Sequence, residues 1–205
     1  MIDMGNIKIA IDINDVIRDN SEQILKVYKK FIDNYCTKEK SDLVNFDTFE
    51  DLEFNSRDEY ENFKYVDYAY EIYGRAEPVE KILPYRLNDW LQTTMRDFEE
   101  DKIPEIIFVS PFEIGLTIQA TLSFLSRIGT RVREIYFPID SMSIWDRCDI
   151  LITANPNLIE NKPEGKKVFK INAPYNTEAK GDYEYDSLLD IIYDKDEKII
   201  KLIEE

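Results

Sequence analysis

Asp12 ends an apolar stretch, IKIAID at Ile7–Asp12, and a polar turn with Asn14 and Asp15 follows at once. An apolar run that closes on an acid predicts a buried strand with a carboxylate at its carboxyl end, where ligands bind in open α/β sheets. Aspartate is one of the few side chains that can become a phosphorylated intermediate. The sequence therefore predicts a phosphate-handling site at Asp12.

The residues after Asp12 have spacing suited to an aspartyl nucleophile. Such a nucleophile needs a partner two residues on to protonate the leaving oxygen, and a cation to attract the phosphate. Asn14 stands at the first of these positions, and Arg18 follows in the same turn. An asparagine amide forms hydrogen bonds but does not shuttle a proton at neutral pH. The expected spacing from Asp12 is thus present, but the residue at that position cannot act as a general acid and base.

Composition narrows the chemistry further. Histidine is absent from all 205 residues, which excludes mechanisms with a histidine base and removes the commonest transition-metal ligand. The two cysteines, Cys36 and Cys148, form no spaced cluster and argue against a disulfide framework or a zinc site. A metal in this chain would be a hard cation such as magnesium, held by oxygen atoms.

The charge balance limits the partners. The chain has 42 acidic and 26 basic residues, a formal charge of -16, which repels nucleic-acid backbones and anionic membranes. We expect no nucleic-acid or membrane partner; a small phosphorylated metabolite or a nucleotide fits better, and a protein partner stays open. No segment resembles a signal peptide, and no apolar run approaches the roughly 18 residues that cross a bilayer. We therefore expect a cytoplasmic protein.

Short apolar runs predict the strands that position these residues. The five runs are Ile7–Asp12, Glu105–Ser110, Val132–Phe137, Asp149–Thr153 and Lys166–Ile171. Amphipathic stretches at Tyr85–Glu100 and Ile114–Arg127 predict helices between them, and residues 186–205 predict one or two final helices. Strands that alternate with helices predict an α/β fold, a three-layer Rossmann-like domain with a parallel sheet covered on both faces.

The stretch between the first two predicted strands is too long for an ordinary crossover and contains no good strand. We expect residues 20–84 to form an inserted helical cap, and residues 1–19 and 85–205 to form the α/β core. The cap sequence is rich in aromatic residues, namely Tyr60, Phe63, Tyr65, Tyr68, Tyr70 and Tyr73. These rings either line a lid that stacks on a planar base or pack into a small core of the cap, the commoner arrangement.

Asp12 and Asn14 begin a pattern that resembles the first motif of the haloacid dehalogenase (HAD) superfamily, Asp-x-Asp-x-Thr/Val. EIIFVSPF ends a strand at Ser110, as the second motif does. CDILITANP resembles the fourth motif in the form found in the 5'(3')-deoxyribonucleotidases, and EIYGRAEP resembles the end of that family's helical cap. The order of strands, cap and motifs agrees from Ile7 to about Tyr175.

The resemblance implies a role for each matching residue. Asp12 would be the nucleophile that forms an aspartyl-phosphate, and Asn14 takes the place of the general acid and base. Ser110 would hold phosphate with its hydroxyl, together with the backbone N–H of the next position, which is Pro111. Magnesium would lie on Asp12, the main-chain oxygen of Asn14 and, as an unconventional ligand, Asp15. The other interpretation of Asp15 is a turn residue that caps the following helix.

Several positions depart from the family pattern. Thr153 and Ala154 align with the paired acids that help to hold magnesium, and neither is a carboxylate. The phosphate-binding lysine of the family falls at or beside Ser143, so a compensating charge requires Arg18 or Arg147 to turn inward. Two unit charges about 4 Å apart interact with roughly 4 kcal/mol at an effective dielectric near 20. Losing both neutralising partners is therefore expected to cost several powers of ten in binding or rate.

Three hypotheses follow. The first is a deoxyribonucleotidase-like protein of the HAD fold that has lost most or all phosphatase activity, needs no cofactor, and binds a small ligand or a protein partner. The alternative is an active, magnesium-dependent phosphohydrolase of nucleoside monophosphates in which Asp12 attacks the phosphate. A receiver-like regulator phosphorylated on Asp12 is disfavoured by the long insertion and by the lack of the lysine that such domains use. Turnover that requires both magnesium and Asp12 separates the first two.

Overall fold

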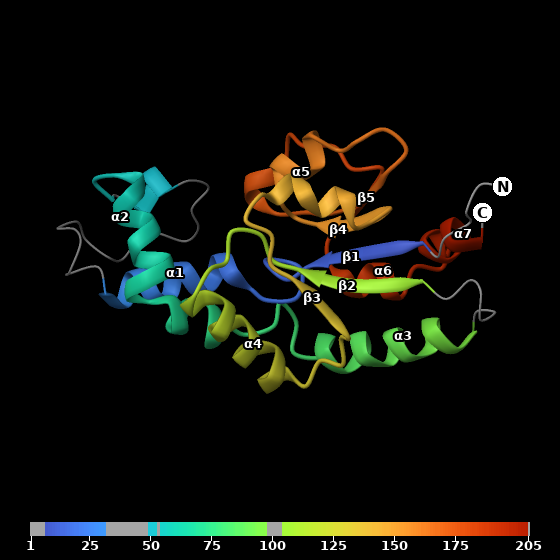
Figure 1. The fold of residues 1–205 in the computed structure, drawn as a ribbon, viewed down its shortest axis with the longest axis horizontal. Helices are drawn as coiled ribbons and strands as arrows, with labels where there is room; N and C mark the ends of the chain where they lie inside the picture. The colour runs from blue at the N-terminus through green and yellow to red at the C-terminus, as the bar shows by residue number, and fades with distance from the viewer. Residues whose placement is uncertain (1–6, 32–48, 53, 98–103, 205) are drawn as a thin grey trace.

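One parallel sheet forms the centre of the molecule (Figure 1). The structure, a computed structural model, describes residues 7–31, 49–52, 54–97 and 104–204. The strands are β1 Lys8–Asp12, β2 Glu105–Val109, β3 Glu134–Tyr136, β4 Ile150–Thr153, β5 Lys167–Ile171 and β6 Tyr183–Tyr185, in the order β3-β2-β1-β4-β5-β6. Every adjacent pair is parallel. The predicted α/β class and parallel sheet are therefore confirmed.

The sequence analysis predicted five strands, and the sheet contains a sixth. All five predicted strands are present within narrower bounds. The missed strand, β6, has only three residues and carries Glu184 between two tyrosines. A short edge strand that is partly exposed on both faces has no apolar run to reveal it.

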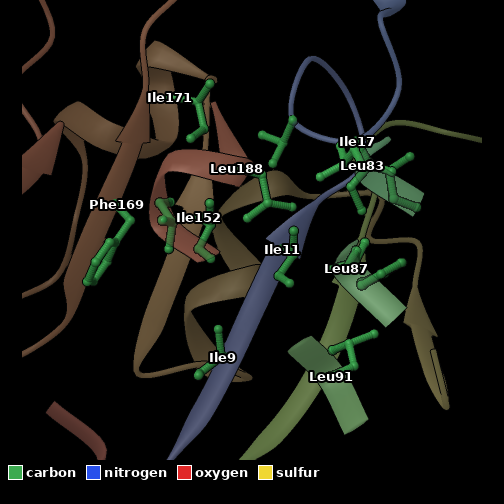
Figure 2. Close-up of a cluster of buried hydrophobic side chains, with 14 of the residues drawn as sticks. Ile9, Ile11, Ile17, Leu83, Leu87, Leu91, Ile152, Phe169, Ile171 and Leu188 are labelled. Atoms are coloured by element: carbon green, nitrogen blue, oxygen red, sulfur yellow. The ribbon is translucent and has the colours of Figure 1, made fainter. Parts of the chain in front are cut away.

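Side chains alternate between two buried faces of the sheet, which gives three layers. In β1, Ile9 and Ile11 point to one face and Ala10 to the other. The first face is covered by α3 Leu83–Asp97, α6 Leu188–Ile192 and α7 Lys198–Glu204, and the second by η5 Ser141–Asp146 and α5 Pro156–Glu160. Figure 2 shows Leu83 and Leu87 of α3 in the cluster with Ile11. Burying such a side chain stabilises the fold by about 1.5–3 kcal/mol.

Helix α4, Leu116–Ile128, contacts both the core and the described part of residues 20–84, which the sequence predicts to be a cap and which is called the cap below. Its Phe124 packs into the core cluster of the first face, whereas its Ala120 packs into the cap cluster. The helix ends at Gly129, whose φ of +70° is the left-handed conformation that glycine adopts at helix C-termini. The predicted helices at 85–100 and 114–127 correspond to α3 and α4; residues 98–100 lie outside the described part.

The described residues between 20 and 84 include helices and no strand. They form α1 Asn20–Phe31, η2 Phe49–Leu52, α2 Arg57–Asn62, the π-helix η3 Phe63–Asp67 and the π-helix η4 Tyr70–Gly74. This region has a hydrophobic cluster of its own, built around the buried Tyr28 and Phe63, and Figure 1 shows α1 and α2 beyond one end of the sheet. The predicted helical character is thus present in the described residues. Cys36 lies outside them.

No helix among the described residues is both long enough and apolar enough to span a membrane.

Candidate functional site

Three neighbouring strands bring the predicted site residues together at one edge of the sheet. β1 lies between β2 and β4, so Asp12, Ser110 and Thr153 meet where these strands end. The Thr153 hydroxyl donates a hydrogen bond to Asp12 Oδ2 at 2.8 Å, across 141 residues of sequence. The backbone N–H of Asn14 donates to Asp12 Oδ1 at 3.1 Å. Both carboxylate oxygens of Asp12 are therefore hydrogen-bonded within the chain.

Asp12 is only 2% exposed. Burial disfavours the charged carboxylate and raises the pKa of Asp12 to about 7, although the hydrogen bonds from Thr153 and Asn14 act in the opposite direction. The carboxyl group therefore titrates close to neutral pH. Its burial gives it a rigid position, as expected for a side chain at the end of a central strand.

Asn14 belongs to a buried hydrogen-bond network. Its amide nitrogen donates to Ser110 Oγ at 3.0 Å, and its amide oxygen accepts from the guanidinium of Arg18. Ser110 Oγ in turn donates to Glu113 Oε1 at 2.5 Å. Asn14 thus fixes the turn after β1 to the loop after β2. Glu113, which the sequence analysis did not single out, is the acceptor that completes this network.

Arg18 turns inward, but its charge is already neutralised. Arg18 and Glu113 form an ion pair of 2.7 Å in which both side chains are buried. The guanidinium also donates to Thr121 Oγ1 at 2.5 Å and to the Tyr73 carbonyl at 3.1 Å. Arg147 instead pairs with Glu134 at 3.5 Å, with both side chains about half exposed. Neither arginine is among the described residues that line the pocket.

Asp15 holds the start of α1. Its backbone has a φ of +56°, in the left-handed region that aspartate tolerates in turns. Its Oδ1 accepts from the backbone N–H groups of Asn20 and Ser21 at 3.0 and 2.8 Å. Its Oδ2 accepts from the hydroxyls of Ser21 and Tyr175 at 2.8 and 2.7 Å. This geometry agrees with the capping interpretation, because four donors occupy the carboxylate.

The turn after β2 offers few donors to a phosphate. Pro111 has no N–H, so the expectation that its backbone donates to phosphate is wrong on chemical grounds; its place in the structure is the pocket wall. The N–H of Ser110 donates to the Tyr136 carbonyl at 3.1 Å, and that of Phe112 to the Pro138 carbonyl at 3.0 Å. The Ser110 hydroxyl proton goes to Glu113.

A pocket of about 280 Å³ opens beside Asp12, between the strand ends and the cap. The core contributes Asp12, Asn14, Asp15, Pro111, Phe112, Asn155, Pro156 and Tyr175, and the segment from 20 to 84 contributes Asn20, Ser21, Ile24, Tyr60, Lys64, Tyr65 and Tyr73. Three of the cap tyrosines thus line the pocket, and Phe63 and Tyr68 make a tilted ring contact within the cap. The same three rings belong to the hydrophobic cluster around Tyr28 and Phe63 or pack against it, as expected for a small core of the cap, whereas stacking on a planar base stays a prediction.

Lys64 is the pocket residue that the sequence analysis missed. Its Nζ lies 4.6 Å from the ring centroid of Tyr60 and 4.8 Å from that of Tyr65. Burial lowers the pKa of Lys64 to about 8. The available signal was its place inside an aromatic run, EYENFKYV, since a lysine between rings is held by cation–π contacts.

The donor set fits magnesium poorly. This ion requires octahedral oxygen ligands, commonly one or two carboxylates with water and substrate phosphate. Asp12 is the carboxylate at the strand ends, and Thr153 and Ala154 at the end of β4 are not carboxylates. Asp15 is taken up by its four donors. Within the described ranges there is no cluster of three or more acidic or cysteine residues that could hold a metal.

No family model and no curated protein sequence matches the chain. Two dehalogenase structures resemble it in fold. The first is 10% identical with a TM-score of 0.47, and the alignment covers 93% of this chain and 96% of that structure's chain. The second, a dehalogenase with an intermediate complex, is 9% identical with a TM-score of 0.48, and the alignment covers 91% of this chain and 95% of that structure's chain. The HAD-hydrolase YfnB of Bacillus subtilis, bound to magnesium, is 11% identical with a TM-score of 0.42 and covers 98% and 100%. These similarities assign no residue role and no activity to this chain.

Proposed function

We propose that this protein is a HAD-like, deoxyribonucleotidase-like binding protein that takes a small phosphorylated ligand in the pocket between core and cap, with phosphatase activity lost or strongly impaired. The observation that carries the proposal is the hydrogen bond from Thr153 to Asp12. In the HAD enzymes that the sequence resembles, acids that help to hold magnesium stand at this place, whereas here a neutral hydroxyl donates to an oxygen of Asp12.

The surroundings of Asp12 also lack the other groups that phosphate hydrolysis needs. Asn14 cannot act as a general acid or base, and its amide is engaged at both ends. The Arg18 charge is balanced by Glu113. Attack by Asp12 on a phosphate would therefore proceed without proton transfer from Asn14, and charge neutralisation would have to come from elsewhere in the pocket.

The pocket itself supports binding. Its volume of about 280 Å³ is close to the lower end of the range for small-molecule sites, roughly 300–1,000 Å³. Tyrosine rings and a lysine on the cap side face the polar strand ends on the core side. Such a lining suits a compact ligand that has both an apolar or planar part and an anionic group.

The test measures binding and turnover on the same ligands. Nucleoside monophosphates and an aryl phosphate are titrated calorimetrically into the protein, and phosphate release is followed with and without magnesium. The matched control is Asp12→Asn, which keeps the size of the buried side chain. Saturable binding with no turnover above the variant supports the proposal. Magnesium-dependent turnover abolished by Asp12→Asn would show an active phosphohydrolase and overturn it.

A further inference from the structure

Among the described residues, the core side of the pocket contains no lysine or arginine. Its two acidic residues are Asp12 and Asp15, and Arg18, a cation of the turn after β1, is buried against Glu113. The N–H groups of Ser110 and Phe112 are used by neighbouring carbonyls. An anionic ligand that enters from the cap side therefore meets two carboxyl groups and few available donors.

The cap supplies the positive charge that the described core residues of the pocket lack. Among the described residues that line the pocket, Lys64 is the sole cation. Lys64 makes no ion pair in the described part of the chain, and the contacts of its ammonium group are with the faces of Tyr60 and Tyr65. Glu61 and Asp15 lie close enough to favour its charged form, and Arg57 opposes it. A cation without a bound carboxylate at the wall of a pocket is available to a ligand.

We propose that Lys64 is the anion-binding residue of this pocket, and that the cap, rather than the core, holds the phosphate group of a small organic phosphate. The inference rests on the proposed function and adds the residue and the ligand class. The ligand carries its charge to the cap wall, where Tyr60 and Tyr65 flank the ammonium group. The affinity of a ligand then depends on its phosphate group and not only on its planar or apolar part.

Two substitutions at Lys64 and one elsewhere test this. Lys64→Gln removes the charge at similar length, and Lys64→Arg keeps it. Lys81→Gln, at an exposed lysine outside the pocket, makes the same change in net charge and is the matched control. Nucleoside monophosphates and phenyl phosphate are each titrated beside the unphosphorylated parent, and circular dichroism checks that every variant folds.

The expected result is a loss of about 10-fold or more in affinity for the phosphorylated probes in Lys64→Gln, the range of a charge-assisted hydrogen bond. Lys64→Arg should retain most of the affinity and Lys81→Gln all of it, while the unphosphorylated parents bind Lys64→Gln and wild type alike. Wild-type binding that Lys64→Gln leaves unchanged would overturn the role of Lys64 and leave the binding function standing. No binding of any phosphorylated probe to wild type would overturn both.

A second measurement reports on Lys64 directly. The lysines are acetylated with a limiting amount of an amine-reactive acetylating reagent, with and without the probe that binds best. Mass spectrometry then measures the extent of acetylation at each lysine. Protection of Lys64 with no protection of Lys81 is expected. Equal labelling of Lys64 in the presence and absence of a saturating probe would contradict the proposal.

Discussion

Arg18 and Glu113 form a buried ion pair of 2.7 Å between the turn after β1 and the loop that leads into α4. Both side chains are excluded from water, and each makes further hydrogen bonds. Because Arg18 also donates to the carbonyl of Tyr73, the pair links the core to one of the cap residues that line the pocket. The charge of Arg18, a residue close to Asp12 in sequence, is thus paired with a protein carboxylate.

Arg18→Met should be strongly destabilising. The change leaves Glu113 buried without its partner, and breaking a buried pair in this way costs about 3–5 kcal/mol. Chemical denaturation with urea measures the free energy of unfolding. The double variant Arg18→Met/Glu113→Leu should recover much of the loss, because no unpaired charge remains. A double variant as unstable as the sum of both single variants would contradict this explanation.

Thr153→Asp should create a cation site next to Asp12. Two carboxyl groups would then face each other in a buried place, so the apo variant should be less stable than wild type by about 1–3 kcal/mol. Magnesium should raise the melting temperature of the variant and have little effect on wild type. The control is Thr153→Val, which should gain nothing from magnesium. An equal response of wild type to magnesium would show that the natural donor set already binds the ion.

The depressed pKa of Lys64 gives a defined pH dependence of stability. Its pKa is about 8 in the folded protein and near the ordinary value of 10.5 in the unfolded chain. Between these values the unfolded chain binds more protons, so the Lys64 contribution to stability rises with pH. Below pH 8 Lys64 is charged in both states, and its charge in the folded protein lowers the free energy of unfolding by the full amount. Lys64→Met should therefore be more stable than wild type at pH 7, and the difference should shrink as the pH approaches 10.5.

The measurement is urea denaturation of both proteins at several pH values, with the difference between them as the readout. Taking this difference cancels the contributions of the other titrating groups, which are the same in both proteins. A constant difference from pH 7 to 10.5 would rule out a depressed pKa at Lys64.

Phe63→Ala should unfold or weaken the cap. Phe63 is 0% exposed and packs against the rings of Tyr28, Phe54 and Tyr68. Truncation of a buried phenylalanine costs about 3–5 kcal/mol. Val66→Ala, at a side chain 57% exposed in the same π-helix, should stay within about 0.5 kcal/mol. Hydrogen exchange shows whether the loss of stability is confined to the cap. Similar losses in Phe63→Ala and Val66→Ala would contradict the buried position of Phe63.

The sequence by itself determined the sheet and its strand-end residues. The runs at 7–12 and 149–153 are mainly apolar because both faces of a parallel sheet are buried, and this pattern can be recognised in the sequence alone. The same pattern places Asp12 and Thr153 at strand ends. It also predicted the helical cap from the excess length between two strands. The short edge strand β6 escaped because its residues are half exposed and carry no such pattern.

Only the tertiary structure decided what the polar side chains do. Whether Arg18 neutralises a ligand or a protein carboxylate depends on Glu113, which lies 95 residues away in the chain. Whether Asp15 is available depends on Tyr175, at a distance of 160 residues. Lys64 became a candidate only when the fold brought it to the same pocket as Asp12. Hydrogen bonds and ion pairs are set by three-dimensional proximity, whereas a strand or helix pattern is local, and so the elements could be predicted and the partners could not.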